Sequence, residues 1–157
     1  MGKLVKLNSE SPDIILVKDA LVSLRKCYPE FTEWYNSKIV PNLDKDREIF
    51  LATKFGDFAG AMILKNSKEE KKICTLFSTI NNEHIGLDLL RIATEELETY
   101  KLPITISDEA LDYFVNNNHF NFYEKDVKSG LYKPGISEHI GYIMFRDQDA
   151  KLHNICY

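Results

Sequence analysis

The chain has 157 residues, 44% of them apolar and 28% charged, with a formal net charge of −4 at pH 7; these values are typical of a globular domain and argue against a general nucleic-acid binder. No apolar run approaches the roughly 20 residues of a membrane helix, and residues 1–14 lack a signal-peptide core. Because Cys27, Cys74 and Cys156 are scattered without CxxC spacing, we expect a reduced, cytoplasmic protein that binds no metal. The length fits a single domain over residues 1–157, and no association with a membrane is expected.

The first 42 residues predict a short strand and two helices. Residues 3–7 could form a short first strand, and Ser11 with Pro12 suits the start of a helix that Pro29 ends. The apolar face of this helix is expected to hold Ile15, Leu16, Ala20, Leu24 and Cys27, with Val17 and Leu21 near it. Residues 30–40 read as a second, shorter helix that stops before Pro41.

The period then changes from that of helices to that of strands. Residues 47–55 and 58–66 are predicted strands, and Gly56–Asp57 between them is a turn signal, so the two should form a hairpin. The charged residues 67–72 form a loop, and residues 73–80 are a third strand. Short links between three strands predict an antiparallel meander.

A long amphipathic helix should follow, from about residue 83 to residue 101. Pro103 ends it, and residues 104–107 form a strand that should run parallel to residues 73–80. Ser107 or Asp108 can cap a further helix over residues 109–118. Residues 120–127 and 138–145 look like a closing pair of strands, with Glu138 and His139 expected to be solvated. The class is therefore α+β, a mixed and mostly antiparallel sheet flanked by helices on both faces.

The segment "STINNEHIG" (78–86) joins a strand to the start of the long helix. The first amides of a helix have no acceptor within the helix, and the helix dipole favours anions there, so such a junction can hold phosphate. The alternative is a plain helix start, because Asn81 or Asn82 is a good N-cap residue.

The order of elements, with a crossover from "LFSTINNEHIGLDLLRIA" to "PITISDEALDYFVNNNHF", resembles the GCN5-related N-acetyltransferases (GNAT) over nearly the whole chain. The family motif Q/R-x-x-G-x-G/A falls on residues 81–86: Gly86 matches its last position, whereas Asn81 and His84 replace the usual Gln or Arg and the first glycine. The resemblance implies an acetyl-CoA cosubstrate. Its pantetheine would lie on Phe77, Ser78 and Thr79, and its pyrophosphate on the amides of Asn82, Glu83, His84, Ile85, Gly86 and Leu87. We expect Glu83 and His84 to weaken this binding.

The resemblance also implies where the chemistry occurs. The family often uses a tyrosine to protonate the leaving thiolate, and in "DYFVNNNHF" (112–120) its position falls on Phe114 or Val115, one or two residues from Tyr113. Tyr113 is the candidate catalytic acid; the alternative is a packing aromatic. The first two helices wall the acceptor site in the family, so Tyr28, Trp34 and Tyr35 are candidate substrate-binding residues. The alternative is that these aromatics pack on the sheet.

Two functions are compatible with these patterns. The first is an N-acetyltransferase, monomeric or homodimeric, that moves an acetyl group directly from acetyl-CoA to a primary amine of a small molecule or peptide, with no nucleic-acid partner. The alternative is a catalytically degenerate protein of the same fold, acting as a CoA sensor or a protein-interaction module. A Rossmann-type nucleotide binder is disfavoured because no GxGxxG occurs.

Overall fold

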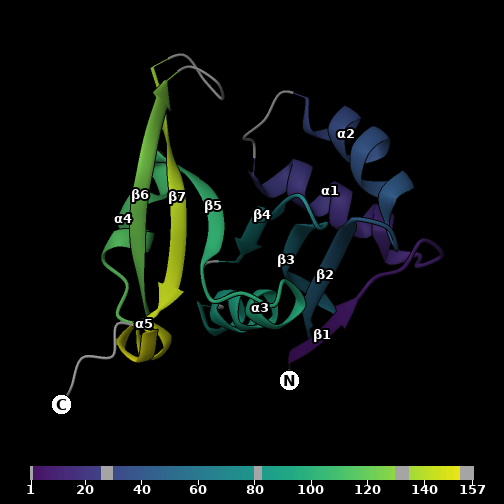
Figure 1. The fold of residues 1–157 in the computed structure, drawn as a ribbon. Helices are drawn as coiled ribbons and strands as arrows, with labels where there is room; N and C mark the ends of the chain where they lie inside the picture. Colours follow the sequence, from purple (N-terminus) through teal and green to yellow (C-terminus); the bar gives the residue numbers. More distant parts are fainter. Residues whose placement is uncertain (1, 26–29, 80–82, 130–134, 153–157) are drawn as a thin grey trace. The chain divides into compact units, whose positions relative to one another are not determined.

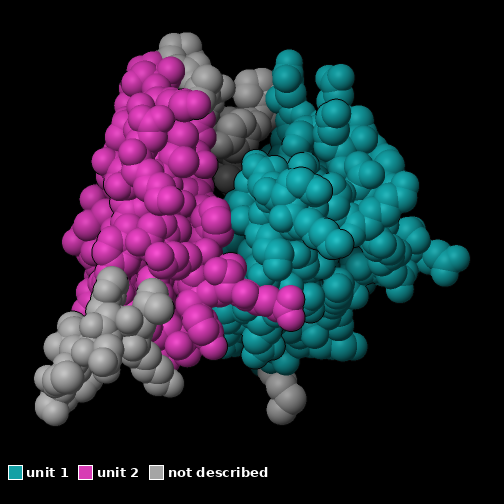
Figure 2. All heavy atoms as spheres, in the orientation of Figure 1, with its two compact units in different colours: residues 1–97 teal, residues 98–157 magenta. Residues whose placement is uncertain are grey.

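The computed structural model describes residues 2–25, 30–79, 83–129 and 135–152. The chain forms two compact units, Met1–Leu97 and Glu98–Tyr157, which Figure 2 shows in teal and magenta. The boundary lies at Glu98, whose left-handed backbone (φ +53°) follows the end of a helix. The expectation of one domain over residues 1–157 therefore stays a prediction.

Unit 1 contains a four-stranded antiparallel sheet in the order β1-β2-β3-β4 (Figure 1). The strands are β1 (Gly2–Lys6), β2 (Arg47–Lys54), β3 (Asp57–Asn66) and β4 (Lys71–Ser78). The predicted hairpin and meander are confirmed. The hairpin turn lies one residue earlier than expected, at Phe55–Gly56, where both residues have positive φ (+55° and +83°), as hairpins with a right-handed twist require.

The helical elements of unit 1 are α1 (Asp13–Arg25), α2 (Phe31–Trp34), the π-helical turn η1 (Tyr35–Ile39), the 3₁₀ turn η2 (Val40–Asn42) and α3 (Glu83–Glu96). The predicted second helix is divided into α2 and η1, which end before Pro41 as expected, and a separate 3₁₀ turn follows. Pro41 lies in the first positions of η2, where a backbone N–H has no partner within the helix and its loss costs little. Helix α3 ends at Glu96, earlier than the predicted residue 101.

The helices cover both faces of this sheet (Figure 1). Helices α1 and α2 lie on one face, and α3 packs on the opposite face against β3 and β4. On the first face, Val17 and Leu21 of α1 and Tyr35 and Ile39 of η1 join a buried cluster with side chains of β2 and β3. The predicted buried face of α1 is partly wrong, because Ile15 is 63% and Leu16 is 40% exposed.

Unit 2 contains a three-stranded antiparallel sheet in the order β5-β7-β6. Its elements are β5 (Leu102–Ser107), α4 (Asp108–Val115), β6 (Phe120–Ser129), β7 (Ser137–Phe145) and α5 (Arg146–Leu152). The predicted closing pair of strands is confirmed by the β6–β7 pairing. Strand β5 includes Pro103, which the sequence placed before the strand. An edge strand tolerates proline because one row of its N–H groups needs no ladder partner.

The α+β class is confirmed, with antiparallel sheets in both units. The parallel alignment expected for residues 73–80 and 104–107 relates one unit to the other and stays a prediction. Within the described part of the chain, no helix is long and apolar enough to cross a membrane. The same residues contain no group of three or more His, Cys, Asp or Glu side chains arranged to hold a metal ion.

Candidate functional site

The end of strand β4 presents backbone groups away from its only partner in the sheet. The Thr79 N–H donates to the Ala59 carbonyl at 3.0 Å, and Ser78 lies opposite Gly60. Because the direction of backbone groups alternates along an antiparallel strand, the N–H and C=O of Ser78 point away from β3. Strand β4 is an edge of its sheet, so these groups have no strand partner in that sheet. Of Phe77, Ser78 and Thr79, Ser78 thus gives the end of β4 an open backbone edge, whereas the backbone groups of the other two are directed toward β3.

Helix α3 begins at Glu83, a few residues after this edge. Ile85 and Gly86 are buried, whereas His84 is exposed and Leu87 is half-buried. Asn82 lies outside the described residues, and of Glu83 only the backbone is described. The first four N–H groups of a helix this long have no intrahelical acceptor and attract anions. The junction therefore combines strand-edge hydrogen-bonding groups with a helix start that favours negative charge.

Gly60 of β3 holds the end of β4 and the start of α3 close together, and the sequence did not single it out. A Cβ atom at Gly60 would lie 2.7 Å from the Phe77 carbonyl oxygen and 3.2 Å from Cγ2 of Ile85. Both distances are shorter than ordinary contacts. The sequence signal is a glycine between two alanines within an apolar strand, which is typical of close backbone approach.

His84 is exposed at the start of α3. Its side chain lines a cavity of about 220 Å³ together with residues of β1, β2 and α3, including Lys3, Thr53 and Asp88. Strands β1 and β2 lie on the other side of β3 from β4. The expectation that His84 weakens cosubstrate binding stays a prediction.

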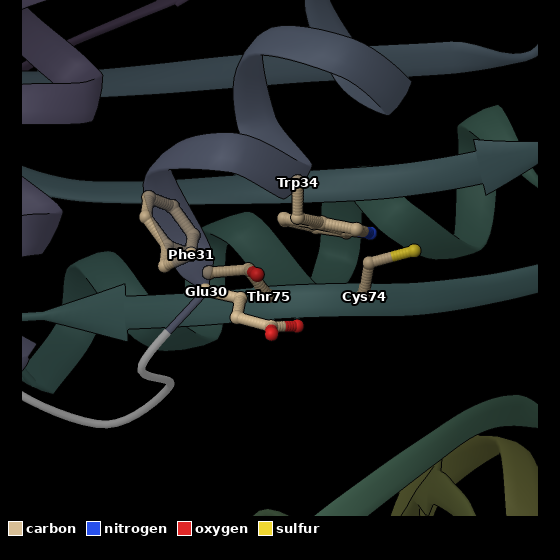
Figure 3. A pocket seen from close by; sticks show the side chains of 5 residues that line it. All are labelled: Glu30, Phe31, Trp34, Cys74 and Thr75. Atoms are coloured by element: carbon tan, nitrogen blue, oxygen red, sulfur yellow. The ribbon is translucent and has the colours of Figure 1, made fainter.

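A second cavity, of about 270 Å³, lies between the start of α2 and strand β4 (Figure 3). It is lined by Glu30, Phe31, Trp34, Cys74 and Thr75. Among the three aromatic residues predicted to bind an acceptor, Trp34 lines this cavity and Tyr28 lies outside the described residues. Glu30 was not singled out from the sequence, because an acidic residue before a helix usually reads as an ordinary helix start.

Tyr35 is placed in the core and not in this cavity. Its side chain is completely buried, and its hydroxyl donates to the Ile14 carbonyl at 2.8 Å. Burial raises the pKa of the Tyr35 hydroxyl well above its usual value. The alternative given above, an aromatic that packs on the sheet, describes Tyr35, which ties η1 to α1.

Cys74 contributes a neutral thiol to the cavity. Arg47 donates from Nη1 to its Sγ at 3.2 Å. Burial nevertheless raises the pKa of the Cys74 thiol, and the charge of Arg47 only partly offsets this. A thiol of raised pKa is a poor nucleophile near neutral pH, so Cys74 is a lining residue and not a candidate for covalent chemistry.

Tyr113 lies on α4 in unit 2 beside an aromatic cluster. The residue is 41% exposed, and its ring meets Phe114 edge-to-face, with 5.1 Å between the ring centroids. Of the two positions at which the family tyrosine was expected, Phe114 is buried and Val115 is exposed. A catalytic role for Tyr113 stays a prediction.

His139 is the centre of an ionic cluster in unit 2, which corrects the expectation of solvated residues at the start of β7. Its Nε2 lies 2.5 Å from Oδ1 of Asp108, and its Nδ1 contacts Oε1 of Glu124. The carboxylates of Asp108 and Glu124 raise the pKa of His139. The neighbouring Glu138 is buried, and only 12% of the His139 side chain is exposed. With a carboxylate at both nitrogens, the protonated form of His139 is favoured.

No family model and no curated protein sequence matches this chain. Solved structures do match its fold. The ribosomal-protein-S18-alanine N-acetyltransferase from Escherichia coli superposes with a TM-score of 0.65 at 14% identity, covering 92% of this chain and 94% of its own. A GNAT-family acetyltransferase from Bacillus cereus ATCC 10987 gives 0.63 at 16% identity, covering 92% and 97%. A GNAT-family acetyltransferase from Elizabethkingia anophelis, with acetyl-CoA bound, gives 0.56 at 17% identity, covering 92% and 97%. The chain therefore has the GNAT fold.

Proposed function

We propose that this chain is an acetyl-CoA-dependent N-acetyltransferase that transfers the acetyl group directly to a primary amine of a small molecule or peptide. The observation that carries the proposal is the junction of the open β4 edge with the start of α3, in a chain with the fold of acetyltransferases. One of these structural neighbours has acetyl-CoA bound.

Each part of the junction suits one part of the cosubstrate. The outward N–H and C=O of Ser78 can pair with the amide groups of pantetheine as another strand would. The amides at the start of α3, in residues 82–87, suit the pyrophosphate because they are donors at the positive end of a helix dipole. Gly60 keeps these two parts adjacent by allowing close packing of β3, β4 and α3.

The chemistry requires a neutral amine beside the thioester that acetyl-CoA supplies. The amine nitrogen forms a bond to the acetyl carbon, the carbon–sulfur bond breaks, and the amine proton passes to a base or to water. The leaving thiolate takes up a proton, for which Tyr113 is the candidate donor among the described residues.

Calorimetry with acetyl-CoA and CoA tests the cosubstrate, and release of free thiol with a panel of primary amines tests the transfer. The sharpest variant is Ser78→Pro, which removes one outward N–H that the sheet does not use, and it should weaken acetyl-CoA binding about fivefold. Its matched control is Lys6→Pro on β1, at the opposite edge of the sheet. Because Leu7 donates to Ile49, the Lys6 amide also points outward, and this variant should bind normally.

Absence of binding at high micromolar acetyl-CoA would overturn the proposal. Binding without turnover across the amine panel would favour the alternative of a CoA sensor, which needs the same junction and no acceptor.

A further inference from the structure

The cavity between α2 and β4 has aromatic walls from one helix. Phe31 and Trp34 stand three residues apart on α2, with 5.6 Å between their ring centroids and 48° between the planes. In Figure 3 both rings come from the helix and lie over the strand that carries Cys74 and Thr75. Flat aromatic faces and a volume of about 270 Å³ suit a compact, largely apolar ligand, because larger drug-like ligands occupy roughly 300 to 1,000 Å³.

The charge that lines this cavity is negative. Among the described lining residues, Glu30 is the only acidic one. Burial raises the pKa of the Cys74 thiol, which keeps this side chain neutral. Glu30 precedes α2 but makes no side-chain capping hydrogen bond to it. Figure 3 labels Glu30 and Thr75 among the residues that line the cavity, so its lining includes a carboxylate and a hydroxyl as well as the aromatic rings.

No basic residue is among the described residues that line the cavity. Arg47 donates to the Cys74 sulfur, and Lys65 and Lys72 share the carboxylate of Glu70 at 3.3 and 3.2 Å. Among its described lining residues, the cavity therefore offers a carboxylate and no positive charge.

We infer that this cavity binds a compact organic amine with an aromatic or similarly apolar body, its ammonium group at the carboxylate of Glu30 and its body against Trp34. A ligand with an ammonium group is attracted by the Glu30 carboxylate and by the face of the Trp34 indole ring, whereas a ligand with a carboxylate is repelled by both. That this amine is also the acetyl acceptor rests on the proposed function; the binding itself does not.

Trp34 is the only tryptophan of the chain, so intrinsic fluorescence reports on this cavity without any cosubstrate. Three probes of similar size differ in charge: phenethylamine, 2-phenylethanol and 3-phenylpropionate. With the full chain, phenethylamine should bind about fivefold more tightly than the alcohol, and the carboxylate should bind most weakly. Glu30→Gln should weaken phenethylamine binding about fivefold and leave the affinity for the alcohol unchanged.

Glu33→Gln is the matched control, because Glu33 is an exposed acid of the same helix that does not line the cavity. It removes the same charge and should leave phenethylamine binding unchanged. Equal affinity for all three probes, no fluorescence response to any of them, or equal effects of the two substitutions would overturn the inference. Tightest binding of 3-phenylpropionate would overturn it too and would assign the cavity to Arg47.

The two proposals fail independently. Selective amine binding without any acetyl-CoA binding would overturn the proposed function and leave the cavity assignment intact. If the chain binds acetyl-CoA but the cavity does not distinguish the three probes, the cavity assignment is overturned and the proposed function stands.

Discussion

Gly60 lies directly against the carbonyl oxygen of Phe77, so that a Cβ atom at Gly60 would stand 2.7 Å from it and 3.3 Å from Cα of Ser78. The contact is backbone to backbone, which leaves no flexible side chain to move aside. Any side chain at position 60 must therefore separate β3 from the end of β4 or displace Ile85 at the start of α3.

Gly60→Ala should lower both stability and cosubstrate affinity. Overpacking of this kind costs about 1–3 kcal/mol, and the same displacement moves the Ser78 backbone relative to the first amides of α3. We expect a lower denaturation midpoint and several-fold weaker acetyl-CoA binding by calorimetry. Gly2→Ala is the control, because a Cβ there would lie 3.9 Å from its nearest neighbour. Unchanged stability and affinity in Gly60→Ala would contradict this account of the junction.

Gly141→Ala should destabilise unit 2 more strongly. Strand β6 has a bulge between Glu124 and Asp126 opposite Gly141 and Ile140, and a Cβ at Gly141 would collide with the Tyr123 carbonyl and lie 3.0 Å from Cα of Glu124. Because the neighbours are backbone atoms on a paired strand, the expected loss is about 3 kcal/mol or more, measured by urea denaturation. A midpoint equal to that of Gly2→Ala would show that the bulge can relax.

The sequence could predict the strands, because their alternation and turn residues are local signals. It could not orient α1, because residues 14–17 are four consecutive apolar residues and no period can be read from them; the structure buries Val17 and exposes Ile15. It located the 78–87 junction, which is a local pattern. It missed Glu30 and Gly60, whose roles arise only when α2 and α3 pack on the sheet, and it could not see that His139 meets two carboxylates distant in sequence.

Stability should fall on the alkaline side because of His139. Asp108 and Glu124 raise the pKa of His139 above its ordinary value of 6.5, so its contribution is complete below pH 6.5 and is lost as pH rises through the raised pKa. His139→Gln should therefore remove the decline of the urea midpoint above neutral pH. His119→Gln replaces an exposed histidine of the same unit and should keep that decline. If the decline also disappears in His119→Gln, the contacts of His139 are not its cause.

The acid side has a different origin. His139 and the Ser137 N–H, which donates to Oδ2 at 3.0 Å, lower the pKa of Asp108 below its ordinary value of 3.8. This contribution is present above pH 3.8 and is lost as pH falls through the lowered pKa. In Asp108→Asn, the urea midpoint should therefore fall less steeply than in the native chain as the pH is lowered into the acid range. The same pH dependence in both proteins would show that other carboxylates control acid unfolding.

Glu83→Gln should tighten CoA binding by roughly two- to fivefold at low salt, because it removes a negative charge from the first turn of α3 where the pyrophosphate is proposed to lie. The gain should shrink as ionic strength rises, since salt screens exposed charges. His84→Gly is the informative companion. The sequence alone predicts tighter binding for it too, but the His84 side chain lines the cavity with Lys3 and Asp88, so calorimetry should show little gain. If Glu83→Gln also leaves affinity unchanged at low salt, the junction is a turn and the pyrophosphate binds elsewhere.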